Sequence, residues 1–80
     1  MKYNSNIYKI VAYNIKKYRM IAKLTQKELA DLSGYSYEYI RYIEAPNTEK
    51  SFSIELVYII SIVLKIPIYN FFKLDVVSKK

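Results

Sequence analysis

The chain has 80 residues with neither cysteine nor histidine, which excludes disulfide bonds, thiolate-based zinc sites and the commonest catalytic base. Its 13 basic residues outnumber 7 acidic ones, and the net charge of +6 suits a polyanionic partner as well as simple solubility. No apolar run is long enough to span a membrane, and residues 1–6 lack the apolar core of a signal peptide, so we expect a cytoplasmic protein.

Two helices are predicted in the first half of the chain. Apolar residues recur with a helical period over residues 7–22. The next helix is expected to begin after Thr25, which stands in the capping-box relation to Glu28. It is expected to end near Gly34, the only glycine, which can adopt the left-handed conformation of a helix cap.

Three further helices are predicted in the second half. Residues 36–44 and 53–64 each open on a serine that can cap a helix, and Pro46 breaks the pattern between them. A short fifth helix is expected over residues 68–72, with Pro67 as its first helical residue. The sequence therefore predicts one all-α domain over residues 1–80, with residues 1–6 as an N-terminal arm and residues 75–80 as a frayed tail.

The segment over residues 26–45 predicts two helices that cross closely around a short turn. Ala30 lies in the middle of the first helix, where a methyl side chain lets the second helix approach, and Gly34 permits positive φ in the turn. Ile40 and Ile43 fall on the inward side of the second helix. This spacing is typical of a helix-turn-helix.

The same residues carry a resemblance that extends over most of the chain. The matching positions are Thr25-Gln26-Lys27-Glu28-Leu29-Ala30, Gly34, Tyr39-Ile40, Ile43-Glu44, Ser53-Ile54-Glu55, Ile60, Leu64 and Ile66-Pro67. In this pattern the chain resembles the lambda-repressor-like family, the Cro/cI type also called XRE. The resemblance implies a compact five-helix DNA-binding domain in which residues 36–44 form the recognition helix.

The outward face of this recognition helix carries Tyr37, Glu38, Arg41 and Tyr42. In a major groove Arg41 can fork onto the O6 and N7 of guanine, and the two tyrosines can contact thymine methyl groups or a phosphate. Glu38 can accept from cytosine N4, but the role we favour is orienting Arg41, because phosphates repel a carboxylate. The alternative is a plain solvated helix surface.

Phosphate contacts are expected from polar and basic side chains near helix starts and in the loop after residue 44. These residues are Gln26, Lys27, Ser36, Asn47, Thr48 and Lys50. Gln26 is favoured because a helix N-terminus presents free amides and partial positive charge, and the resemblance gives it a backbone contact. Lys27, Asn47, Thr48 and Lys50 are weaker candidates, and for any single one of them a plain surface residue is the favoured interpretation.

An ion pair between Arg19 and Glu44 is implied by the resemblance. The pair is expected to be partly buried and to tie the first helix to the end of the recognition helix, and Arg19 can also touch a phosphate. One departure lies beside it, because Ala45-Pro46 stands where the family often has glycine, in a loop that is longer than is common.

Ile59 and Ile62 occupy positions in the fourth helix that are usually polar in the family. A dimer interface is therefore predicted from apolar residues of the last two helices: Ile59, Ile62, Ile66, Ile68 and Phe71. The alternative is a larger core that the N-terminal segment covers. We favour a homodimer over this alternative because operators are commonly palindromic.

These features predict a sequence-specific regulator of transcription that binds double-stranded DNA. We expect a repressor of a phage or mobile element, or a controller of a restriction–modification system, acting as a homodimer on a palindromic operator. The alternative is a protein-interaction module such as an antitoxin held by its apolar helices. An enzyme is not expected, since no nucleophile constellation is present. We expect no cofactor, metal, membrane or small-molecule ligand.

Overall fold

The computed structural model describes residues 7–46 and 51–74. In this part the chain forms the helices α1 (Ile7–Ile21), α2 (Gln26–Ser33), α3 (Tyr37–Glu44) and α4 (Ile54–Leu64), followed by the 3-10 helix η1 (Ile68–Phe72). No strand occurs among these residues, which confirms the all-α prediction for them. None of these helices is long and apolar enough to cross a bilayer. The predicted arm, the tail, Asn47, Thr48 and Lys50 lie outside the described residues.

The predicted fifth helix is corrected by the structure. η1 has only five residues, and the amides of Asn70 and Lys73 donate to carbonyls three residues back, as in a 3-10 helix. Pro67 lies before η1 with ψ 138°, which is extended backbone and not a first helical position. A segment of one or two turns lacks the length at which an α-helix becomes favourable, so packing decides its form.

The predicted helix boundaries at the turn are confirmed by their caps. Thr25 Oγ1 accepts from the amide of Glu28 at 3.0 Å, and Glu28 Oε1 accepts from the amide of Thr25 at 2.8 Å. Ser36 and Ser53 cap α3 and α4 with their hydroxyl groups, which accept from the amides of Tyr39 and Leu56. Gly34 ends α2 with φ 85°, a conformation that any other L-residue adopts at a cost.

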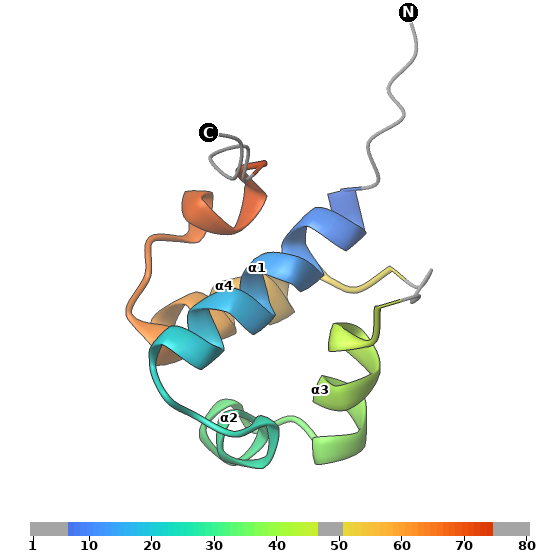
Figure 1. Cartoon of the computed structure of the whole chain (residues 1–80), viewed down its shortest axis with the longest axis vertical. Coiled ribbons are helices and arrows are strands. Elements are labelled where there is room, and N and C mark those ends of the chain that lie inside the picture. The colour runs from blue at the N-terminus through green and yellow to red at the C-terminus, as the bar shows by residue number, and fades with distance from the viewer. Residues whose placement is uncertain (1–6, 47–50, 75–80) are drawn as a thin grey trace, which may run out of the picture.

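The helices form two groups around one core (Figure 1). α2 and α3 lie at one end of the molecule and pack on each other, while α1 packs against α3, α4 and η1. In Figure 1 α4 lies behind α1. The buried apolar residues come from all five elements: Val11, Ala12, Ile15, Leu29, Ala30, Ile40, Ile43, Leu56, Val57, Ile60, Leu64 and Phe71.

The predicted dimer face is partly wrong. Phe71 is 0% exposed and its ring meets Tyr18 edge-on at 5.3 Å, so it belongs to the core of this chain. Ile66 and Ile68 are half-buried and pack against that core, and Ile59 is half-buried as well. Ile62 alone of the five is clearly exposed. The error arises because η1 turns back onto α1, which the apolar pattern of a short segment does not reveal.

Asn14 fastens η1 to the middle of α1. This side chain is buried, and its Nδ2 donates to the carbonyl oxygens of Phe71 at 2.8 Å and Lys73 at 3.0 Å. One amide group therefore satisfies two backbone acceptors at the end of η1, which holds Phe71 in the core. The sequence analysis missed this residue.

Replacing Asn14 by alanine leaves these two carbonyls without their donor. Since an unsatisfied buried polar group costs about 1–3 kcal/mol, Asn14→Ala should lower the free energy of unfolding by that amount. Chemical denaturation followed by circular dichroism measures this loss. Asn70→Ala, at a half-buried position of η1, is the control, and equal losses in the two variants would contradict the proposed fastening role.

Candidate nucleic-acid interface

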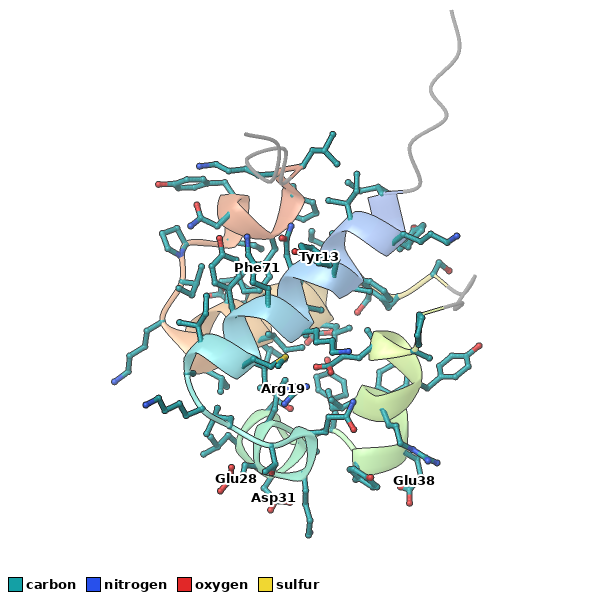
Figure 2. All side chains as sticks on the ribbon, viewed as in Figure 1. Tyr13, Arg19, Glu28, Asp31, Glu38 and Phe71 are labelled. Carbon is teal, nitrogen blue, oxygen red and sulfur yellow. The ribbon has the colours of Figure 1, made fainter. Side chains whose placement is uncertain are left out.

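α3 has one buried side and one exposed side. Ile40 and Ile43 are almost completely buried. Tyr37, Glu38, Arg41 and Tyr42 are all exposed, and Figure 2 shows Glu38 pointing away from the core. The structure therefore brings the four predicted base-reading residues together on one surface, where they can enter a groove. Their contacts with bases stay a prediction.

Arg41 is positioned by an aromatic ring and not by Glu38. Its guanidinium lies over the ring of Tyr37 with 5.6 Å between Cζ and the ring centroid. Within the described residues no ion pair joins Glu38 to Arg41, and the favoured orienting role of Glu38 on DNA stays a prediction. Tyr37 and Arg41 are one helical turn apart, which lets the ring face attract the cation without removing either group from water.

A buried polar cluster joins three helices behind this surface. Arg19 binds both carboxylate oxygens of Glu44, with 2.8 Å from Nε to Oε2 and 2.9 Å from Nη2 to Oε1. The Arg19 side chain is 10% exposed and that of Glu44 only 1%. A further Arg19 nitrogen, Nη1, donates to the carbonyl of Leu24 at 2.7 Å. The ion pair implied by the resemblance is present, and Figure 2 shows Arg19 between α1 and α2.

Gln26 belongs to the same cluster. Its Nε2 donates to Glu44 Oε1 at 3.0 Å, so the first residue of α2 is fixed to the last residue of α3. An amide side chain has two N–H groups and a carbonyl, so this bond leaves capacity for a phosphate. The structure therefore gives Gln26 a structural contact that the sequence did not predict, beside its expected phosphate contact.

Two of the remaining predicted phosphate residues, Lys27 and Ser36, lie in the described part of the chain and are exposed. Lys27 lies 3.9 Å from Asp31 in a surface pair whose two side chains are 73% and 68% exposed. Ser36 Oγ accepts from the amide of Tyr39 at 3.0 Å, which still leaves its hydroxyl hydrogen to donate. Both residues can reach a phosphate without breaking a buried contact.

A groove between α1 and the end of α3 was missed by the sequence analysis. It has a volume of about 290 Å³ and is lined by Lys9, Ala12, Tyr13, Lys16, Glu44, Ala45 and Pro46. Its two lysines and Tyr13 follow each other at helical spacing along α1, a signal that was read only as general basic charge. The groove places two lysines of α1, Lys9 and Lys16, beside the end of α3.

Tyr35 lies in the turn between α2 and α3, and the sequence analysis did not assign it a role at this surface. Burial, and then the negative charge of Glu55, raise the pKa of its hydroxyl above the ordinary value of 10.0. Its ring lies 5.6 Å from that of Tyr39. The arrangement supplies a neutral hydroxyl beside the start of α3. In the described part of the chain, no group of three or more acidic side chains could hold a metal ion.

Comparison with known proteins agrees with this geometry. A family model described as Helix-turn-helix matches residues 15–71. The master regulator for biofilm formation SinR, solved in complex with DNA, has a TM-score of 0.71 and 27% identity, over 79% of this chain and 98% of that chain. No curated protein sequence matches significantly.

Two more distant structures share the fold. The clp gene regulator ClgR from C. glutamicum has a TM-score of 0.79 at 19% identity, over 96% of this chain and 97% of that chain. A hypothetical transcription factor, NHTF from Neisseria, has a TM-score of 0.79 at 18% identity, over 88% of this chain and 78% of that chain. At these identities the likeness concerns the fold alone.

Removing the Glu44 carboxylate should destabilise the protein strongly. Glu44→Ala leaves the buried Arg19 cation unpaired, and breaking such a pair costs about 3–5 kcal/mol. Thermal and chemical unfolding without DNA measure the loss. Asp31→Ala, which breaks the exposed pair with Lys27, is the matched control and should change stability by less than about 1 kcal/mol. Similar small effects of both variants would contradict a structural role for the buried pair.

Proposed function

The chain belongs to the XRE-type helix-turn-helix family, and we propose that it is a sequence-specific repressor that binds a palindromic DNA operator as a homodimer. The observation that carries this proposal is the outward face of α3, where Arg41 and its neighbours are exposed while the opposite face is locked into the core. The DNA complex of SinR, with 27% identity, supports DNA as the partner.

Arg41 is the proposed main reader of base sequence. A guanidinium can donate two parallel hydrogen bonds to the O6 and N7 of guanine, and the Tyr37 ring holds it on the outer face before DNA arrives. Tyr37 and Tyr42 would contact thymine methyl groups or a phosphate. Glu38 would accept from cytosine N4, since it makes no ion pair with Arg41 within the described residues.

Phosphates on either side of the groove would be bound by the edges of the same surface. Gln26, Lys27 and Ser36 lie at the starts of α2 and α3, where backbone amides also face outward. The lysines of the α1 groove extend this positive surface on the other side of α3. Asn47, Thr48 and Lys50 are proposed as further contacts from the loop.

Arg41→Ala should reduce binding to the specific operator by about 1–3 kcal/mol and relax the preference at one base position. Fluorescence anisotropy with operator DNA and with unrelated DNA measures both effects. Lys27→Ala is the control and should weaken binding to the two DNAs about equally, because a phosphate contact carries no sequence information. If Arg41→Ala leaves the ratio of the two affinities unchanged, Arg41 does not read a base.

Binding should also depend steeply on salt. If a dimer neutralises roughly 6–10 phosphates, affinity should fall by about 10³–10⁵ between 50 and 200 mM salt, because released counterions drive association. Titrations over this range give the slope, and replacing Lys16 by alanine should make it shallower if the α1 groove touches a phosphate. An affinity that hardly changes with salt would contradict binding through the phosphate backbone.

A further inference from the structure

The α1 groove, between α1 and the end of α3, is lined in part by small apolar side chains. Ala12 of α1 is 7% exposed and lies on its inner side, and Ala45 and Pro46 line it at the end of α3. Alanine ends at Cβ, so these positions leave room that a larger side chain would fill. The volume of about 290 Å³ lies close to the lower end of the range of roughly 300–1,000 Å³ found for ligand pockets, which suits a small molecule.

The wall at the end of α3 is a feature of this sequence. Ala45 has extended backbone with φ −61° and ψ 138°, and Pro46 follows it. Glycine often stands here in the family that the chain resembles, and a glycine would leave this side of the groove as bare backbone. The methyl group of Ala45 and the ring of Pro46 provide apolar surface in its place.

The α1 side of the groove is positively charged. α1 contains no acidic residue, and Lys9 and Lys16, both exposed, line the groove about two helical turns apart. Glu44 also lines the groove, but its side chain is 1% exposed and both of its carboxylate oxygens accept from Arg19. A ligand in the groove therefore meets positive charge.

One aromatic ring lies between the two lysines. Tyr13 is four residues after Lys9 and three before Lys16, so the three side chains share one face of α1. The Tyr13 side chain is 56% exposed, and the ammonium group of Lys17 lies 5.9 Å from the centroid of its ring. An exposed ring beside an apolar wall can stack on the ring of a ligand.

We propose that the α1 groove binds a small aromatic acid. The ring of the ligand lies between Tyr13 and Pro46, and its anionic group lies within reach of the ammonium groups of Lys9 and Lys16. An inorganic anion alone would leave the apolar wall in contact with water, and a neutral ring would gain nothing from the lysines. The class of ligand that uses both features carries a planar ring and a negative charge.

Such a ligand competes with DNA for the same lysines. The α1 groove adjoins the end of α3, and its lysines are proposed to contact phosphates of the operator. One ammonium group cannot be occupied by a bound acid and by a phosphate at the same time, so the acid lowers the affinity for DNA and acts as an effector. This step rests on the proposed DNA-binding function, whereas binding of the acid does not.

Titrations with three probes at constant ionic strength test the class of ligand. 2-Naphthoate carries a ring and a charge, 2-naphthylmethanol only the ring, and inorganic phosphate only the charge. Two-dimensional NMR should show saturable shifts for naphthoate, centred on the amides of Lys9, Tyr13, Lys16 and Ala45, and weaker binding of the other two probes. Absence of saturable shifts overturns the proposal. Equal affinity for either control probe also overturns it, because one of the two features then has no role.

Variants locate the bound acid. Tyr13→Ala should weaken naphthoate binding about 2–10-fold through loss of ring stacking, and Lys16→Ala about 1.5–5-fold through loss of an exposed charge. Lys65→Gln, at an exposed lysine that caps α4, is the control and should bind naphthoate like the original chain. Thermal melts check that each variant is folded. Equal losses in Lys16→Ala and Lys65→Gln would indicate general attraction by the net charge and overturn the site.

The effector role is tested by fluorescence anisotropy with operator DNA. Saturating naphthoate should weaken DNA binding by the original chain, and 2-naphthylmethanol at the same concentration and ionic strength should not. If naphthoate occupies the groove and leaves the affinity for DNA unchanged, the effector role is overturned. A chain that binds no DNA at all would refute the proposed function, and the NMR titration would still decide whether the groove binds an aromatic acid.

Discussion

The buried cluster of Arg19, Glu44 and Gln26 is the contact on which the orientation of the recognition helix depends. A carboxylate that is 1% exposed is unfavourable unless every lone pair finds a donor, and these donors come from α1 and α2. They meet only when the three helices are docked together. Through Glu44, the last residue of α3, the cluster therefore fixes the orientation of α3 relative to α1 and α2.

The outer face of α3 is exposed, whereas its inner face is held by the core. Ile40, Ile43 and Glu44 are buried and hold the helix, while Tyr37, Glu38, Arg41 and Tyr42 are exposed. The ring of Tyr37 restrains Arg41 in the free protein, so less side-chain entropy is lost when the guanidinium binds a partner. In the free protein Arg41 thus lies over the Tyr37 ring, whereas the sequence favoured Glu38 as its orienting partner because phosphates repel a carboxylate.

Local chemistry made most of the fold predictable, since the capping box at Thr25, the serine caps and the left-handed Gly34 each depend on neighbours in sequence. Contacts between segments that are distant in sequence were harder to predict. Phe71 and Ile54 are both apolar, yet one fills the core and the other faces water, because the return of η1 onto α1 decides which surface is covered. Asn14 contacts η1 and the α1 groove forms between α1 and the end of α3, so both depend on contacts between distant segments and were missed.

η1 is attached to α1 through its backbone carbonyls and one buried ring, and its other side chains form part of the surface. Asn14 binds backbone carbonyls, and Phe71 is the only residue of η1 that is fully buried. Tyr69 and Phe72 are exposed, and their side chains take no part in these two hydrogen bonds. Substitutions of Tyr69 or Phe72 therefore change the surface of η1 without removing the hydrogen bonds that attach it to Asn14. The same separation holds in α4, where the inner side is fixed by the core and the outer side, with Ile54, Tyr58 and Ile62, is exposed.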